Sequence, residues 1–437
     1  MAILQQRKFF FLSILFLLVI RLIFIYSFGL FSIPTRGDAV SYQNYAINII
    51  NGFDWLKNPQ FHGHYRAPGY PIILAIIYSL FGKNNLLAVY IMQSLISILT
   101  CLYIYKLCRK IFNKKVAMLA FVWAGCYIFY LYYASMVLRE TLIYFLIISF
   151  FYHLYLFLTD EHNKRTNFWI LSIIFSIMIH TDSRYLFYIP FLALLFIVYQ
   201  PLQLGVKKYL IFLTVTILLM IPWTIRNYIA YDAFVLIDTR TVDLRNRNDR
   251  NPEMERLMNN TLNFGIINYI YAENIKNYPN IQERALVKSG LNPNNRSSQE
   301  IEAIKNDIFP DSTYFGRKLY WLVELWRPFR LSADYYPFPD ARFHGNWSLR
   351  HNLITLLCYG SLLPFMIFSI YYLIRKKERV IWFLLFPPGI LTVLQVQQWG
   401  IERYRHPIDS FVIILGTYGM FIVSQYIWAK RKCYKKR

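Results

Sequence analysis

One aspartate stands where a membrane-embedded catalyst would place a base. Asp38 lies in the stretch "TRGDAVSYQNYA", residues 35–46, directly after the apolar run 9–31. At a membrane–water boundary a carboxylate can stay ionised at modest cost, and it can then accept a proton from a hydroxyl held nearby. The position therefore predicts a general base at the start of a surface helix. The simpler alternative is that Asp38 only caps this helix.

The same predicted outer loop contains a second polar stretch. "HYRAPGYP", residues 64–71, supplies His64, Tyr65 and Arg66. The planar guanidinium of an arginine can bind two oxygens of one phosphate. Together with Asp38, Arg66 therefore predicts a site for a substrate that carries a phosphate. The alternative is that Arg66 extends to the lipid headgroups.

Other charged residues share a location at the predicted outer ends of apolar runs. For any one of them, anchoring a span at the membrane interface is the ordinary role. As a set they bring arginines from five chain segments toward Asp38, which predicts a cationic basin that suits an anionic lipid head. Besides Arg66, the set comprises Arg139 with Glu140, Asp182 with Arg184, Arg226, and Arg403 in "ERYRHP".

The elements that must position these residues are transmembrane helices. Of the 437 residues, 56% are hydrophobic and only 16% are charged, which is too apolar for a soluble protein of this size. The net charge of +23 does not indicate a nucleic-acid partner, because the basic residues form clusters between apolar runs. This is the positive-inside pattern, so the clusters predict cytoplasmic loops and contact with membrane lipids.

The length of the apolar runs gives the topology, because about 20 apolar residues are needed to cross the hydrocarbon core. The sequence predicts an all-α polytopic protein of the cell membrane, with about ten spans and both termini in the cytoplasm. A break at residues 180–184 is predicted because only two short spans there keep every basic cluster on one side. The predicted spans are 9–31, 85–108, 115–133, 138–158, 167–182, 184–202, 209–228, 351–374, 379–397 and 407–429.

This topology divides the chain into three parts. Residues 1–228 form a transmembrane core that includes the first outer loop, 32–84. Residues 229–350 form an extracytoplasmic region, and residues 351–437 form the last helices and a basic cytoplasmic tail. The polar residues discussed above therefore all lie on the extracytoplasmic side.

Two surface helices are predicted in the first outer loop. Tyr42, Tyr45 and Ala46 recur at helical spacing, which predicts an apolar face that lies on the membrane surface. A second helix is predicted from Pro71 to Phe81, because proline is favoured in the first turn of a helix and Gly82 follows its last residue.

Several catalytic patterns are absent from the sequence. There is no G-x-x-x-x-G-K-[ST] phosphate loop, no G-x-S-x-G elbow and no H-E-x-x-H zinc motif, and the five cysteines form no C-x-x-C pair. No metal ligand and no required cofactor are therefore assigned. A divalent metal stays open as an alternative, because His64, His180 or His406 could bind one together with Glu140.

Five stretches of the chain together resemble the GT-C membrane glycosyltransferases. The similarity is to bacterial members related to protein O-mannosyltransferases and to the aminoarabinose transferase that modifies lipid A, which are glycosyltransferase family 39-like proteins. It runs from residue 9 to about residue 230 and resumes at about residue 351. The stretches are "GDAVSYQNYAINIINGFDW", "YRAPGYPIILAIIYSLFG", "LRETLIYFLIISFFYHLYLFL", "IPWTIRNY" and "ERYRHPIDSFVIILGTYG".

The resemblance implies a transferase that takes a sugar from a polyprenyl-phosphate donor at the extracytoplasmic face. The acceptor would be a glycan, lipid or protein of the cell envelope. Asp38 matches the catalytic carboxylate of the family, and Glu140 matches a second acidic position. Arg66 matches a donor-phosphate group, and Arg403 matches the arginine of an "RY" motif.

The chemistry of such a donor also predicts the mechanism. A sugar on a lipid phosphate already has a good leaving group, so neither a nucleotide nor a general acid is needed. Asp38 would take the proton of the acceptor hydroxyl, and Arg66, Arg403 and Arg184 would stabilise the departing phosphate. Direct displacement would invert the anomeric configuration. Further site candidates are Glu140, Tyr65, Arg226 and His64.

Two positions of the chain depart from the family pattern. Many relatives have two acidic residues where this chain has Asp38-Ala39, and two prolines where it has Ala67-Pro68.

Three other functions compete with the transferase. A transporter or flippase of lipid-linked saccharides would place polar residues inside the spans, and in this chain Arg21 is the clearest charged residue inside a span. A saccharide ligase or polymerase would carry its chemistry in 229–350, and a non-catalytic assembly subunit would tolerate loss of Asp38.

Overall fold

The part of the chain that the structure describes is mostly helical. The computed structural model describes residues 2–29, 37–51, 67–160, 162–198, 205–231, 234–238, 319, 322–323, 325–328, 353–398 and 402–434. The chain forms two compact units. The first comprises Met1–Met258, Ser361–Ile390 and His406–Arg437, and the second comprises Asn259–Gly360 and Leu391–Arg405. The three-part division predicted from the sequence stays a prediction.

Helices occupy the ranges where the apolar runs predicted spans, which confirms an all-α polytopic membrane fold. Within the described residues, five helices are long and apolar enough to cross a membrane, or six if the bent pair α5 and α6 is one span. The predicted number of ten spans stays a prediction. The helices are α1 (Ala2–Phe24), α2 (Gly37–Ile50), α3 (Gly69–Phe81), α4 (Leu86–Ile111), α5 (Lys114–Gly125), α6 (Ile128–Ala134), α7 (Glu140–Thr159), α8 (Lys164–Thr181), α9 (Tyr188–Val198), α10 (Gly205–Tyr231), α17 (Leu362–Arg375), α18 (Val380–Gln398) and α19 (Asp409–Tyr434).

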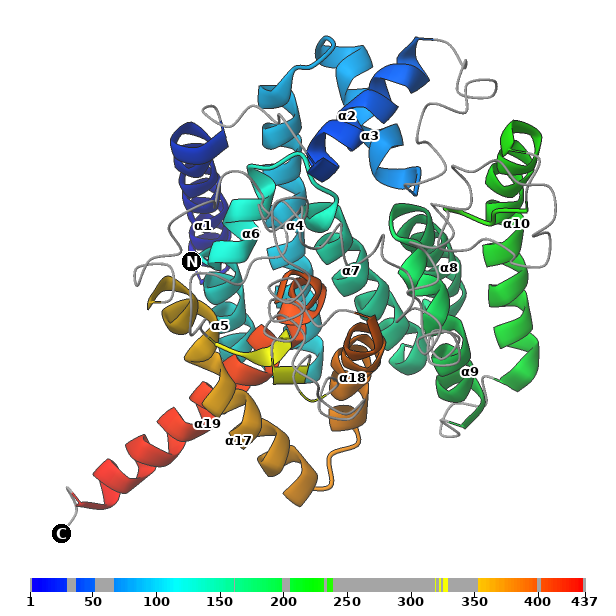
Figure 1. Cartoon of the computed structure of the whole chain (residues 1–437). Coiled ribbons are helices and arrows are strands. Elements are labelled where there is room, and N and C mark those ends of the chain that lie inside the picture. Colours follow the sequence, from blue (N-terminus) through cyan, green and yellow to red (C-terminus); the bar gives the residue numbers. More distant parts are fainter. Residues whose placement is uncertain are drawn as a thin grey trace, which may run out of the picture. The chain divides into compact units, whose positions relative to one another are not determined.

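Helix α7 forms the core of the first unit (Figure 1). It is apolar on every side, and most of its side chains are buried, as expected for a helix surrounded by other helices. Phe150 packs on Phe175 of α8, with ring centroids 5.4 Å apart, and Phe151 packs on Phe411 of α19 at 5.3 Å. Its first residue, Glu140, is one of the predicted site residues, so this packing fixes the position of that carboxylate.

Arg21, the clearest charged residue inside a predicted span, ties α1 to two neighbouring helices. Its guanidinium donates to Ser97 Oγ of α4 at 2.9 Å, and to the carbonyl of Gly125 at 3.4 Å. Gly125 is the last residue of α5, where the chain bends by 48° into α6. A break in a helix leaves carbonyl groups without their usual partners, and Arg21 supplies a donor to one of them.

The described part of residues 32–84 contains both predicted surface helices, α2 and α3. The apolar face of α2, however, packs against protein and not against the membrane surface. Tyr42, Tyr45 and Ala46 of α2 are buried against protein instead of lying on the membrane surface. Tyr42 contacts Tyr70 of α3 edge to face at 5.0 Å, and Tyr45 lies 6.4 Å from Trp223 of α10. The helical spacing predicted an apolar face correctly, but spacing alone does not distinguish a lipid from a protein partner. Helix α3 ends at Gly82, whose φ of 98° favours glycine.

In the second unit, the described residues surround Arg405. This buried arginine donates to the carbonyl of Leu325 at 3.1 Å, and its guanidinium lies 3.5 Å from the centroid of the Tyr359 ring. Tyr359 in turn donates to the carbonyl of Trp326 at 3.0 Å. These contacts connect the segment 325–328 and Tyr359 to the residues that precede α19.

Two glycines of α19 allow α17 to approach closely. A Cβ at Gly419 would overlap the carbonyl oxygen of Phe365 and lie 2.7 Å from the carbonyl carbon. A Cβ at Gly416 would lie 2.8 Å from Leu362 Cδ2. Small residues at such crossings are common in membrane helices, because packing drives their association.

We expect Gly419→Ala to lower the unfolding temperature of the purified protein in detergent. The added methyl group meets backbone atoms that cannot rotate away, and overpacking of this kind costs about 1–3 kcal/mol. Gly389→Ala in α18 is the matched control, since nothing lies within 4 Å of the Cβ added there. Equal unfolding temperatures for the two variants would contradict the close crossing of α17 and α19.

Candidate active site

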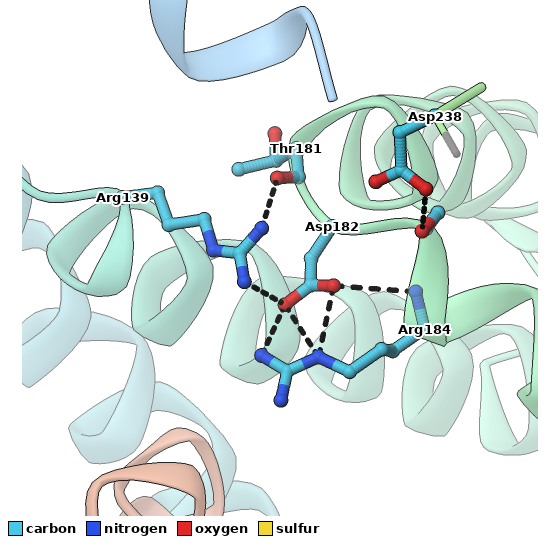
Figure 2. Close-up of polar contacts among 6 residues, drawn as sticks. Arg139, Thr181, Asp182, Arg184 and Asp238 are labelled. Carbon is cyan, nitrogen blue, oxygen red and sulfur yellow. Dashed lines mark hydrogen bonds and ion pairs between the residues drawn. The ribbon is translucent and has the colours of Figure 1, made fainter. Parts of the chain in front are cut away.

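Charged residues from four chain segments gather in the first unit. They come from the start of α2, the turn before α7, the turn after α8, and the short segment 234–238 that follows α10. The centre of the cluster is Asp182, which is 1% exposed. Figure 2 shows the guanidinium groups of Arg139 and Arg184 converging on its carboxylate.

Asp182 bridges two arginines. Arg139 Nη2 lies 3.0 Å from Asp182 Oδ2, and Arg184 Nε donates to both carboxylate oxygens at 3.0 Å. The same carboxylate accepts from the backbone N–H of Arg184 at 3.2 Å, so it also caps the short 3-10 helix Ser183–Phe187. Burial lowers the pKa of Arg139, but Asp182 together with Tyr42, Glu140 and Asp38 more than offsets this, so that pKa lies above the usual value of arginine. Arg139 therefore stays charged.

Two of the predicted carboxylates lie beside this bridge. Arg139 is within electrostatic range of Asp38, Glu140 and Tyr42. Asp38 is in the first turn of α2 and partly buried, and Glu140 is the first residue of α7 and buried. Both carboxylates are at helix N-termini, where the helix dipole favours negative charge. The structure thus brings Asp38, Glu140 and Arg184 together around residues of three helices.

A further carboxylate, Asp238, reaches the cluster through Ser183. The Ser183 hydroxyl donates to Asp238 Oδ1 at 2.8 Å, and both residues are buried (Figure 2). Asp238 was not among the predicted site residues. It lies at the start of the polar, Asn-rich region, where nothing in the sequence distinguishes it from its neighbours. Arg139 and Asp182 are recognisable in the sequence as charges at span ends, but nothing in their spacing predicts that they form a pair.

The predicted cationic basin stays a prediction, because Arg66 lies outside the described residues and Arg403 lies in the second unit. Among the residues that the described interactions connect, carboxylates outnumber guanidinium groups by four to two: Asp38, Glu140, Asp182 and Asp238 against Arg139 and Arg184. Counting arginines along the sequence could not show which carboxylates fold against them.

The other predicted site residues are distributed as follows. Arg226 of α10 is buried, with its guanidinium 5.1 Å from the centroid of the Trp223 ring and its Nη1 donating to Asn227 Oδ1 at 2.9 Å. Arg403 lies in the second unit, in the 3-10 helix Glu402–Tyr404. His64, Tyr65 and Arg66 fall outside the described residues.

A second buried polar group involves His406, which the sequence left open as a metal ligand. His406 Nδ1 lies 2.9 Å from Asp409 Oδ2, and the Tyr127 hydroxyl donates to the same oxygen at 2.7 Å. The His406 ring stacks on Phe129, with centroids 3.9 Å apart. Within the described ranges, no group of three or more His, Cys, Asp or Glu side chains could hold a metal ion.

The chain matches known membrane glycosyltransferases in both sequence and structure. Residues 65–225 match the family described as dolichyl-phosphate-mannose-protein mannosyltransferase. No curated protein sequence matches the chain at a significant level. The resemblance predicted from the sequence is therefore confirmed by a match over part of the chain.

Solved structures from two organisms share the fold. The apo oligosaccharyltransferase of Archaeoglobus fulgidus superposes with a TM-score of 0.55 at 15% identity, covering 97% of this chain and 52% of that one. ArnT from Cupriavidus metallidurans superposes with a TM-score of 0.59 in the apo state, at 12% identity, and covers 98% of this chain and 62% of ArnT. ArnT bound to undecaprenyl phosphate gives 0.57 at 12% identity, with 97% and 62% covered.

These matches establish the GT-C fold for this chain. At identities of 12–15% they concern the fold alone, and the chain spans 52–62% of the length of these solved structures. The described helices therefore share the fold of these solved proteins, and five or six of them are long and apolar enough to cross a membrane. Its activity, substrates and orientation have to be argued from its own residues.

We expect Asp182→Asn to lower the free energy of unfolding by about 3 kcal/mol, because it neutralises the carboxylate that two largely buried guanidinium groups share. Adding Arg139→Met should recover part of the loss, since it removes one of the two charges that this carboxylate balances. Chemical denaturation in detergent would measure both changes. Asp160→Asn, in an exposed turn, is the control. An Asp182→Asn protein as stable as the unmodified one would show that the bridge does not hold these segments together.

Proposed function

We propose that this protein is a membrane glycosyltransferase that moves a sugar from a polyprenyl-phosphate donor to an acceptor hydroxyl. The reaction takes place at the extracytoplasmic face and inverts the anomeric configuration. The acceptor is a glycan, lipid or protein of the cell envelope. The observation that carries the proposal is the gathering of Asp38 and Glu140 beside the Arg139–Asp182–Arg184 bridge in a GT-C fold.

The donor class is supported by the neighbours and by the chemistry of the cluster. One ArnT structure holds undecaprenyl phosphate, and one structure of the archaeal oligosaccharyltransferase holds dolichol-phosphate. Arg184 has an exposed fraction of 13% and Arg139 of 9%, so both can meet a headgroup that enters the site. Guanidinium groups held in place before the reaction stabilise a departing phosphate more than mobile ones do.

Asp38 is the proposed general base. It is partly buried at the first turn of α2, and it faces the same arginine as Glu140. As the acceptor oxygen attacks the anomeric carbon, its proton passes to Asp38, and the bond between that carbon and the phosphate oxygen breaks. The phosphate leaves with its electron pair and stays on the lipid. Arg66 and Arg403 complete the proposed donor-phosphate site, with His64, Tyr65 and Arg226 as further members.

A transporter or flippase has less support from the same residues. Arg21 is the clearest charged residue in a span, and its guanidinium binds Ser97 and the carbonyls of Leu17 and Gly125. A substrate pathway would require polar groups that face a passage. A saccharide ligase would use residues of 229–350, most of which lie outside the described part of the chain.

We expect Asp38→Asn to reduce sugar transfer by about 10²–10⁴-fold, the usual contribution of a general base. The assay is transfer from a radiolabelled undecaprenyl-phosphate sugar by the purified protein in proteoliposomes. Asp160→Asn serves as the matched control, and we expect it to transfer normally. If Asp38→Asn folds normally and transfers at the full rate, Asp38 is not the base. A wild-type protein that is inactive with every such donor would refute the proposed function.

A divalent metal is the alternative source of positive charge. The sequence left Glu140 open as a ligand together with His64, His180 or His406, and one neighbouring structure of the archaeal oligosaccharyltransferase was solved with Zn and sulfate. The proposed mechanism requires no metal, because the arginines stabilise the phosphate. We therefore expect transfer to continue in excess EDTA. Loss of transfer in EDTA, restored by a divalent cation, would assign part of this role to a metal.

A further inference from the structure

The hydrogen bond between Ser183 and Asp238 joins the arginine bridge to a distant part of the chain. Ser183 lies between Asp182 and Arg184 in sequence and is 1% exposed. Asp238 is fully buried, and its Oδ1 accepts from the Ser183 hydroxyl at 2.8 Å. The two residues are 55 positions apart, so this contact depends on the tertiary fold.

Helix α10 holds Asp238 in place. Three side chains near the end of α10 donate to backbone carbonyls of the segment that leads to Asp238. Trp223 Nε1 donates to the carbonyl of Ile237 at 2.8 Å, Thr224 Oγ1 to that of Leu236 at 3.0 Å, and Asn227 Nδ2 to that of Val235 at 3.0 Å. Because consecutive carbonyls are held, the backbone before Asp238 has little freedom to move.

The 3-10 helix that carries Arg184 is thereby fixed at two points. Asp182 fixes it from within, by accepting from the backbone N–H and the guanidinium of Arg184. Asp238, which is not part of the 3-10 helix, holds it in place by accepting a hydrogen bond from Ser183. A carboxylate can only accept hydrogen bonds, so the serine must be the donor and the contact has a single orientation.

We propose that Asp238 is a positioning residue of the donor-phosphate site, acting through Ser183 to fix the 3-10 helix that presents Arg184. This rests on the proposed function, in which Arg184 binds the lipid phosphate. Asp238 itself does not touch the donor. Its removal therefore weakens donor binding, while the chemical step, which depends on Asp38, continues.

The test compares single and double variants in the transfer assay. We expect Ser183→Ala to raise the donor KM about tenfold, equivalent to about 1.4 kcal/mol, with kcat changed less than about twofold. Asp238→Ala should raise the donor KM at least as much, and adding Ser183→Ala to it should cause no further loss, because both variants remove the contact between Ser183 and Asp238. Asp238→Asn should behave like the wild type, since its amide oxygen can still accept from Ser183.

A matched control separates positioning from general destabilisation. Ser172→Ala in α8 also removes a buried hydroxyl, but that hydroxyl donates to the carbonyl of Phe168 within its own helix. We expect it to leave the donor KM unchanged, even if it shifts the unfolding temperature as much as Ser183→Ala does. A wild-type KM for Ser183→Ala would overturn the inference. An Asp238→Asn variant as defective as Asp238→Ala would do so too, because Asp238 would then act by its charge.

Binding of undecaprenyl phosphate to the full chain in nanodiscs gives a readout without transfer. If the wild type binds this lipid but transfers no sugar, the proposed function fails while the inference can still be judged. Weaker lipid binding by Ser183→Ala would then support the positioning role, and equal binding would refute it. If the wild type does not bind the lipid, the positioning role is wrong as well.

Discussion

The site depends on one carboxylate, Asp182, that holds two arginines at once. Arg139 precedes α7 and Arg184 follows α8, so the bridge fixes two helix ends that lie far apart in sequence. Two guanidinium groups placed this close would repel each other in a partly dry environment, and the carboxylate makes the arrangement stable. Asp38 and Glu140 then lie within electrostatic range of the Arg139 guanidinium, which stays positively charged.

The transmembrane helices supply the rigidity that this bridge requires. Aromatic packing on Phe150 and Phe151 surrounds α7, and close backbone contact at Gly419 joins α17 to α19. Arg21 has a comparable role away from the site, since it satisfies a carbonyl at the bend between α5 and α6. In a medium without water, a polar contact such as that of Arg21 is costly to lose, so it holds the helices in position.

The sequence predicted those features that depend on local chemistry. Apolar length located the helices, and a charge at a span end singled out Asp38, Glu140 and Arg184 as candidates. Pairing could not be predicted, because Asp182 and Asp238 resemble many other acidic residues until the fold brings them to their partners. The face of α2 was assigned to lipid for a related reason. Hydrophobic spacing shows that Tyr42 and Tyr45 avoid water, but protein and lipid satisfy that requirement equally.

The charge balance of the cluster constrains how a lipid phosphate can bind. Four carboxylates and two arginines are connected by the described contacts, so further positive charge would favour the binding of a phosphate there. In the proposed mechanism this charge comes from Arg66 and Arg403, which the sequence assigns to the donor. A divalent cation would supply it in a different way. Either source would offset the repulsion between the phosphate and the carboxylates, which is strongest where the site excludes water.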